Sequence, residues 1–577
     1  MKQEKPNDLG NPQLGWGSDA IAEMLHRLKF SYVSVVPGAS FRGLHDSIVN
    51  YLGNEQPAMV ITLHEEHAVA IAHGYSKVTE RPMAAALHSN VGLLHASMAI
   101  FNAWCDRAPV LILGATGPMA ADRRRPWIDW IHTSHDQGSL VRSFTKWDDQ
   151  PTSVPAALES LLRANALTTT APAGPVYLCL DVDLQERALA GEVVFPDVTR
   201  FKLGAPSAPA RETVSEIAAT LTTAKRPLML AGRVSRSEAG WRDRIALAEL
   251  LKSPVLTDLK VAAAFPTRHP LHVVPPTFFM DGEAAQLLTE ADVILSLDWL
   301  DLAGTLKTAG VDLNKTKIVH CSYDAYAHKA PSADHQGLAP ADIALACPPE
   351  SLVGDVIDAI DRIDRTPPQH VWWTPSETAA DVKVVLHGAI TQLDIAKALD
   401  RARGDQELCL TQVSLGWPSA ACDFDGPLDY LGRDGGAGIG SGPGIAVGAA
   451  LGLAGSGRIP VAIIGDGDHA MGATAIWSAV HHKLPLVVLI TNNRSYMNDE
   501  RHQQRVAELR DRPVDNKWIG QRMEDPEIDH AGLARAQGAE SFGPITEHGE
   551  LETTIGRALD IAEGGGVAVV DIHIVRD

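Results

Sequence analysis

The chain has 577 residues, of which 45% are hydrophobic and 21% are charged, and its formal net charge is −21. This acidic balance excludes non-specific binding to nucleic acid or to an anionic membrane through a net positive field. At about 150 residues per domain, the length allows three to four domains.

The cysteines are scattered, with no CxxC pair and no metal-ligand spacing, which predicts free thiols in a chain of this length. They are Cys105, Cys179, Cys321, Cys347, Cys409 and Cys422. No apolar run approaches the ~18–20 residues that a membrane helix needs. Residues 1–17 are polar and lack an apolar core, so we expect a flexible arm rather than a secretory signal, and a cytoplasmic protein.

Strand-like apolar runs alternate with helical stretches along the chain, which predicts parallel sheets covered by helices. The first block carries the runs 31–38, 58–65, 83–89, 108–115 and 174–183. The second carries 226–233, 253–260, 291–298 and 316–322, and the third carries 407–413, 459–468, 484–493 and 567–575. Segments rich in Pro and small residues separate the blocks.

We therefore predict an α/β protein of three domains, each with a mainly parallel sheet. The predicted boundaries are an arm at 1–17, domains at 18–190, 211–365 and 385–577, and linkers at 191–210 and 366–384.

Asp466 lies between two glycines at the end of one strand-like run, and the pair Asn492–Asn493 ends the next run. Ligands of open parallel sheets bind beyond the carboxyl ends of the strands. Glycines let the backbone approach a phosphate, a helix starting near residue 470 would point its N-terminus at an anion, and Asp and Asn oxygens suit Mg²⁺. The pattern predicts a Mg²⁺-diphosphate site. The alternative is that Asp466 is a turn residue and the Asn pair caps a strand.

The GDG run, followed by Asn493 27 positions after Asp466, resembles the signature of thiamine diphosphate (ThDP) enzymes. The resemblance implies that Asp466, Asn493 and Ser495, the last through its carbonyl, hold Mg²⁺. It also implies cofactor contacts from Gly465, Gly467, Asp468 and Tyr496. Asp468 departs from the small or hydroxyl residue usual there, so we expect it to point away or to reach the metal through water.

The glycine-rich run 435–452 opens a helix of small apolar residues. In ThDP enzymes this segment wraps the aminopyrimidine, and aligning Gly440 implies that Ile439 supports the bent cofactor and that the Ala437 carbonyl accepts from its amino group. The alternative is that the run provides tight packing of a helix on a sheet.

Glu65 begins the pattern E-x-x-A-x-x-x-A-x-G-Y, which continues to Tyr75 and resembles the segment of ThDP enzymes that carries the general acid. This acid protonates N1′ of the pyrimidine, and desolvation raises the pKa of a carboxyl group that does so. Glu66, one position further into the helix, better fits a solvated glutamate at a helix start.

The segment 63–113 and the run 265–272 resemble benzoylformate decarboxylase. His88, in "LHSNVG", matches a histidine that protonates or orients the substrate-derived intermediate. The sequence departs from that family at two places. Its active-site serine follows a Pro-Gly pair, whereas here Ala39 follows the pair and Ser40 comes next. Its second active-site histidine has no match in residues 295–305.

Other polar residues are candidates for the substrate side. His132 and His135 lie where related enzymes place pocket residues, and Asn498 and His502 follow the predicted metal loop. Which of them enters the site stays open.

The resemblance implies a ThDP- and Mg²⁺-dependent, non-oxidative decarboxylase of a 2-oxo acid that works through an enamine. The alternatives are a carboligase or lyase similar to acetolactate synthase and, less favoured, a non-catalytic ThDP-fold binding subunit. The resemblance also implies a homodimer or homotetramer in which Glu65 and His88 of one chain meet Asp466 and Asn493 of another.

Overall fold

The computed structural model describes residues 1–201, 204, 206–280, 282–323, 337–364, 370–373 and 388–576. The chain divides into two compact units. The first comprises Met1–Lys202, Val385–Gly416 and Asp434–Asp577, and the second comprises Leu203–Val384 and Trp417–Arg433. The predicted linker 366–384 lies outside the described residues apart from 370–373.

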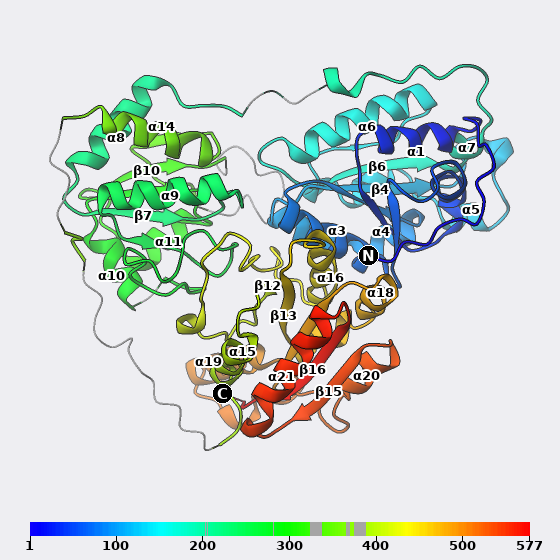
Figure 1. Cartoon of the computed structure of the whole chain (residues 1–577). Helices are drawn as coiled ribbons and strands as arrows, with labels where there is room; N and C mark the ends of the chain where they lie inside the picture. The colour runs from blue at the N-terminus through cyan, green and yellow to red at the C-terminus, as the bar shows by residue number, and fades with distance from the viewer. Residues whose placement is uncertain are drawn as a thin grey trace. The chain divides into compact units, whose positions relative to one another are not determined.

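The first sheet of the first unit has the strand order β2-β1-β3-β4-β6-β5, with all neighbours parallel. Figure 1 labels two of its strands, β4 and β6. Its strands are β1 (Tyr32–Val35), β2 (Ala58–Ile61), β3 (Met83–Leu87), β4 (Val110–Thr116), β5 (Asp148–Asp149) and β6 (Val176–Asp181). Its helices are α1 (Gly17–Arg27), α2 (Arg42–Asp46), α3 (Glu65–Thr79), α4 (Ser89–Cys105), α5 (Ile128–Ile131), α6 (Val154–Thr169) and α7 (Val182–Glu186).

The second unit contains a parallel sheet of order β11-β10-β9-β7-β8. Its strands are β7 (Pro227–Ala231), β8 (Val255–Leu256), β9 (Val293–Leu297), β10 (Lys317–Cys321) and β11 (Ile343–Leu345). Its helices are α8 (Arg211–Thr223), α9 (Glu238–Leu251), α10 (Gly282–Glu290), α11 (Leu302–Ala309) and α14 (Glu350–Asp361).

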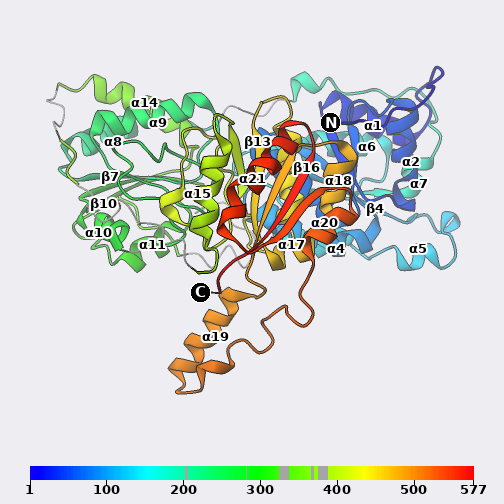
Figure 2. The ribbon, with the colours of Figure 1, turned by 60° about the horizontal axis from the view of Figure 1, so that its bottom comes forward.

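The other sheet of the first unit has the order β12-β13-β14-β16-β15 and is parallel throughout. Its strands are β12 (Leu408–Gln412), β13 (Ile459–Gly465), β14 (Leu486–Asn492), β15 (Glu540–Ile545) and β16 (Val567–His573). Its helices are α15 (Gln392–Arg403), α16 (Gly442–Gly452), α17 (Asp466–Gly472), α18 (Ala475–His482), α19 (Met497–Leu509), α20 (His530–Ala536) and α21 (His548–Glu563). Figure 2 shows α19 projecting away from this sheet.

The predicted fold class is confirmed: three parallel sheets are covered by helices. All thirteen strand-like runs form strands, and the three strands that the sequence did not predict, β5, β11 and β15, each lie at a sheet edge. Edge strands are less buried and need no continuous apolar run. β5 is two aspartates, and the register of β15 shifts between Phe542 and Ile545.

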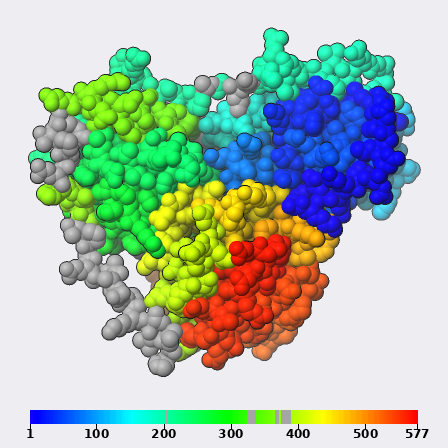
Figure 3. Space-filling view, in the orientation of Figure 1, coloured from blue at the N-terminus to red at the C-terminus, as the bar shows by residue number. Residues whose placement is uncertain are grey.

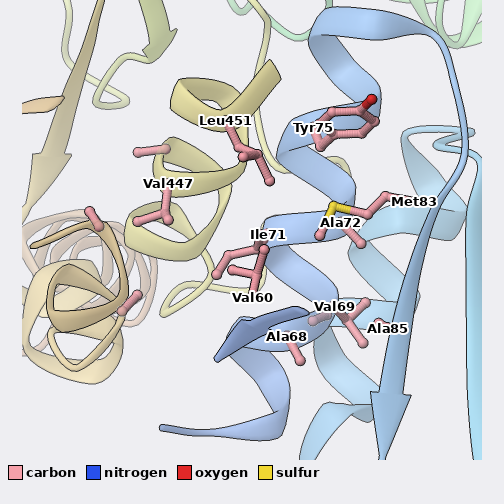
Figure 4. Packing of buried hydrophobic residues seen from close by; sticks show 14 of the residues in the cluster. Val60, Ala68, Val69, Ile71, Ala72, Tyr75, Met83, Ala85, Val447 and Leu451 are labelled. Atoms are coloured by element: carbon pink, nitrogen blue, oxygen red, sulfur yellow. The ribbon is translucent and has the colours of Figure 1, made fainter. Parts of the chain in front are cut away.

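The two sheets of the first unit share one hydrophobic core, in which α3 packs against α16. Val447 and Leu451 of α16 face α3 near Ile71 (Figure 4). The two backbones come so close that a Cβ at Gly74 would collide with the carbonyl of Ile445, and a Cβ at Gly448 with that of Ile71. The small residues of the run 435–452 are therefore explained in part by helix-on-helix packing.

The N-terminal arm contacts both halves of this unit. The Lys2 N–H donates to the His482 carbonyl at 2.6 Å, and Asn54 Nδ2 donates to the Glu4 carbonyl at 2.8 Å. Figure 3 shows the dark blue N-terminal part of the chain directly against an orange part of the same unit.

All six cysteines are free thiols, as predicted. Among the described residues, no helix has the length and apolar character needed to cross a membrane.

Candidate active site

Asp466 and Asn493 lie at adjacent strand ends, because β13 pairs with β14 and Gly465 is level with Thr491. The Ser495 N–H donates to Asp466 Oδ2 at 3.2 Å and to Asn493 Oδ1 at 2.9 Å, so both oxygens converge on one donor. We call Asp466, Asn493 and Ser495 the oxygen cluster.

Asp466 is 4% exposed, and burial raises its pKa from 3.8 to about 6. A divalent cation would lower that pKa again by stabilising the ionised carboxylate. No cluster of three or more His, Cys, Asp or Glu side chains suited to a metal occurs among the described residues. The oxygen cluster needs none, because one carboxylate with amide and backbone oxygens suits Mg²⁺, which retains waters and binds phosphate. The donor set therefore fits Mg²⁺ with a diphosphate.

The two asparagines of the pair have different roles. Asn492 Nδ2 donates to Asp571 Oδ1 at 2.9 Å, and Asn492 Oδ1 accepts from the Arg494 N–H at 3.0 Å, so its side chain supports the turn. Arg576 Nε donates to the Asn493 carbonyl at 2.7 Å. The Asn493 side chain, by contrast, shares the Ser495 N–H with Asp466.

The glycines beside Asp466 differ in what surrounds them. A Cβ at Gly467 would lie 2.8 Å from the Tyr496 ring, so this position must stay small for the ring to pack there. A Cβ at Gly465 would meet open space, which leaves room for a ligand against the backbone. The helix α17 begins at Asp466 itself, four residues earlier than the expected start near 470.

Asp468 points away from the oxygen cluster, as one of the two expectations had it. Its Oδ1 accepts from the Gly440 N–H at 2.7 Å and from the Gly442 N–H at 3.2 Å. Asp468 thus connects the GDG turn to residues 434–441, which we call the glycine-rich loop.

The glycine-rich loop is ordered by the protein itself. Ala437 has φ +55° and its N–H donates to Asp434 Oδ1 at 3.0 Å. Ile439 is 40% exposed, an apolar side chain on a fixed loop, as support of a cofactor requires. The loop therefore fits the aminopyrimidine contacts implied for Ala437 and Ile439.

Glu65 is the first residue of α3 and is 9% exposed. His95 Nδ1 lies 3.1 Å from its Oε2, and Gly92 of α4 packs against its side chain. Glu66 is not simply solvated: its Oε1 accepts from Ser441 Oγ at 2.7 Å. The first turn of α3 thus reaches the glycine-rich loop of the same chain.

His88 lies between β3 and α4, directly before the first residue of α4, and Ser40 Oγ lies 2.8 Å from its Nδ1. The ring of His132 meets it edge-on with centroids 4.7 Å apart. Burial and His132 lower the pKa of His88, which Glu65 raises to a lesser extent. We call Ser40, His88 and His132 the histidine cluster.

The other two candidate histidines do not join this cluster in the structure. His135 is exposed. His502 is exposed on α19, where its Nδ1 lies 3.7 Å from Asp499 Oδ1. A role for either stays a prediction.

Sequence reasoning missed three residues near these groups. Asn102, fully buried in α4, donates to the Gly438 carbonyl at 3.1 Å, and His95 pairs with Glu65. In the sequence, Ser40 only follows the position at which the related decarboxylase has its active-site serine. No sequence signal indicated that it contacts His88.

Three domain models of one family match the chain. They are described as the thiamine pyrophosphate enzyme N-terminal TPP binding domain at residues 15–140, central domain at 214–345 and C-terminal TPP binding domain at 413–572. The chain therefore belongs to the thiamine pyrophosphate (ThDP) enzymes and uses ThDP as its cofactor.

The relatives are decarboxylases and synthases. Benzoylformate decarboxylase of Pseudomonas aeruginosa is 25% identical over 514 residues, covering 87% of this chain and 89% of the relative. Acetolactate synthase of Bacillus subtilis is 23% identical over 500 residues, covering 83% and 82%. The chain is thus an enzyme of the decarboxylase and acetolactate synthase type.

Solved structures share the fold. An enzyme from Mycobacterium smegmatis, titled a putative thiamin diphosphate-dependent enzyme, superposes with a TM-score of 0.77 at 20% identity and covers 100% of both chains. Benzoylformate decarboxylase from Polynucleobacter necessarius gives 0.76 at 22% identity, covering 98% of this chain and 99% of that one.

Proposed function

We propose that this enzyme catalyses the non-oxidative decarboxylation of a 2-oxo acid. The observation that carries the proposal is that the half-buried His88 and the buried Glu65 lie close enough for the Glu65 carboxylate to raise the pKa of the His88 imidazole. A proton donor and a second proton-transferring group are what release of CO₂ followed by protonation requires.

The cofactor and metal have places in this proposal. ThDP, when bound, supplies an electron sink for the bond next to the substrate carbonyl. The oxygen cluster would hold Mg²⁺ and, with Gly465 and Gly467, the diphosphate. Ala437 and Ile439 would hold the aminopyrimidine, and Glu65 would hold a proton at its N1′.

The histidine cluster would face the substrate. Because the pKa of His88 is lowered, its imidazole is neutral at pH 7 and can both accept and donate a proton. Ser40 fixes the ring through Nδ1, so Nε2 is the atom left to meet the substrate. His132 packs against the ring edge-on and limits its movement.

Carboligation, or lyase cleavage of an acyloin or 2-hydroxyacyl compound, is the second candidate, supported by the similarity to acetolactate synthase over most of the chain. Both reactions need the same cofactor contacts and differ in whether a second carbonyl compound replaces the proton. A non-catalytic role is disfavoured because Glu65 and the oxygen cluster are both in place.

The test supplies ThDP and Mg²⁺ and then a panel of aromatic, branched and sugar-derived 2-oxo acids, with and without an aldehyde acceptor, and also acyloins. CO₂ release with formation of the matching aldehyde supports the decarboxylase. A ligated product formed only with the acceptor, or cleavage of an acyloin, supports the second candidate. Absence of turnover across the panel contradicts both.

We also propose a homodimer or homotetramer with Glu65 and His88 of one chain beside Asp466 and Asn493 of another. Within one chain, Glu66 instead contacts Ser441 of the glycine-rich loop. A site shared between chains and a site within one chain give different results in a mixing experiment. Glu65→Gln and Asp466→Ala are each expected to be inactive. When they are unfolded and refolded together, a shared site restores part of the activity, because one site per mixed dimer is intact. A site within one chain restores none.

A further inference from the structure

Asp468 is a buried carboxylate, 6% exposed, whose side chain is turned toward backbone rather than toward the oxygen cluster. One oxygen, Oδ1, accepts two N–H groups, those of Gly440 and Gly442. The other, Oδ2, lies 3.4 Å from Gln412 Nε2 at the end of β12. Asp468 therefore joins the GDG turn, the glycine-rich loop and the start of α16.

The backbone of the loop is shaped for this contact. Gly440 has φ +105°, a left-handed conformation that favours glycine. A Cβ at Gly442 would collide with the Asp468 carboxylate. The two N–H groups would be buried without a partner if the carboxylate were removed, and each such loss is unfavourable.

Side chains of α3 and α4 hold the same loop. Asn102 both donates to the Gly438 carbonyl at 3.1 Å and accepts from the Gly438 N–H at 3.3 Å. Ser441 Oγ donates to Glu66 and accepts from Asn102 Nδ2. The loop that carries Ala437 and Ile439 is thus held by Asp468 from the GDG turn and by Asn102 and Glu66 from α4 and α3.

We propose that Asp468 is a positioning residue that fixes the glycine-rich loop at a set distance from the GDG turn, and that it is a ligand of neither the metal nor the diphosphate. The geometry makes Asp468 a link between the two parts of the site that hold the two ends of ThDP. The inference rests on the proposed function in taking Ala437 and Ile439 as the pyrimidine contacts.

The test compares two probes, ThDP and inorganic pyrophosphate, each with Mg²⁺, by titration calorimetry. In Asp468→Ala the Kd for ThDP is expected to rise at least tenfold, because the loop no longer meets the pyrimidine. The Kd for Mg²⁺-pyrophosphate, which does not touch the loop, should stay within twofold. Asp468→Asn, which keeps an acceptor oxygen for the two N–H groups, should restore most of the ThDP affinity.

Amide hydrogen exchange of the cofactor-free protein gives a readout that needs no activity. Exchange in a peptide covering Gly440 and Gly442 should accelerate at least fivefold in Asp468→Ala. A matched variant, Asn102→Ala, should accelerate exchange at Gly438 and leave the Kd for pyrophosphate unchanged.

Several outcomes would overturn the inference. A parallel loss of pyrophosphate and ThDP affinity would place Asp468 at the metal. Tighter binding of pyrophosphate in Asp468→Ala would mean that the carboxylate repels the diphosphate. Unchanged exchange at Gly440 and Gly442 in Asp468→Ala would contradict the inference, and if that variant does not fold, Asp468→Ser, whose shorter side chain does not reach the two N–H groups, carries the same test. Failure of the wild-type protein to bind ThDP would instead contradict the proposed cofactor site, while the exchange experiment would still test Asp468.

Discussion

The oxygen cluster and the histidine cluster are built in different ways. Asp466 and Asn493 follow two neighbouring strands, and they converge because the sheet brings those strand ends together. Ser40, His88 and His132 come from three separate segments and meet only through their side chains. The oxygen cluster therefore depends on backbone geometry, whereas the histidine cluster depends on side-chain contacts that single substitutions can change.

Removal of the Asp466 carboxylate should have the largest effect. In Asp466→Ala we expect activity to fall at least about 1000-fold, because the charge that holds the cation is lost, and Mg²⁺-dependent binding of ThDP to disappear in calorimetry. Asp499→Asn is the control, since this carboxylate is exposed on α19 and should leave both unchanged. Retention of Mg²⁺-dependent ThDP binding in Asp466→Ala would show that cofactor binding does not depend on the oxygen cluster.

Glu65→Gln should separate binding from chemistry. We expect kcat to fall about 100-fold or more, the usual contribution of a general acid, while the Kd for ThDP stays within threefold. Glu66→Gln is the matched control one residue away: it keeps an acceptor for Ser441 and should lose less than fivefold. If the two variants behave in the opposite way, the acid has been assigned to the wrong glutamate.

The stability contributed by a buried histidine pair should depend on pH. His469 and His530 are buried with their Nδ1 atoms 2.9 Å apart, and burial lowers the pKa of His469 to about 3 and of His530 to about 4 from 6.5. The unfolded state therefore binds protons first as pH falls below 6.5, so stability is full above that pH and is lost as pH falls toward 4. The difference in unfolding free energy between pH 7 and pH 5 should shrink by about 2 kcal/mol in His530→Asn.

Denaturant unfolding at the two pH values measures this difference. His135→Asn, a change at an exposed histidine, should leave it unchanged. An equal pH response of His530→Asn and wild type would show that this histidine is protonated as easily in the folded protein as in the unfolded chain.

The smallest effect is expected from Ser40→Ala. Loss of one hydrogen bond to His88 is worth about 1 kcal/mol, so kcat/KM should fall up to about tenfold while the Kd for ThDP is unchanged. The acid limb of the pH–rate profile should also shift, because Ser40 no longer holds Nδ1. Ser40→Thr, which keeps the hydroxyl, should restore the profile. A weakened affinity for ThDP would show that the histidine cluster also affects cofactor binding, which would contradict the separation of the two clusters.

Sequence predicted the fold well where burial is continuous. The apolar runs of the inner strands reveal them, whereas β5, β11 and β15 lie at edges and are held by neighbours distant in sequence. The placement of Asp466 beside Asn493 was predictable for the same reason, since consecutive strands of a parallel sheet end at one edge.

The direction of side chains was not predictable. Asp468 follows Gly467 in the chain, yet its carboxylate meets residues 26 and 28 positions earlier. Ser40 and His88 are 48 positions apart, and Glu66 reaches Ser441 across the shared core. Such contacts depend on how the helices pack against each other, which a local sequence pattern does not predict.

The crossing of α3 and α16 has a consequence for how this enzyme could diversify. Gly74 and Gly448 let one backbone touch the other, so the spacing between α3 and α16 is set by direct backbone contact. Substitutions in the substrate pocket could then change the substrate during evolution while the geometry of the cofactor site stays the same. Any larger residue at either glycine would alter that geometry for every substrate at once.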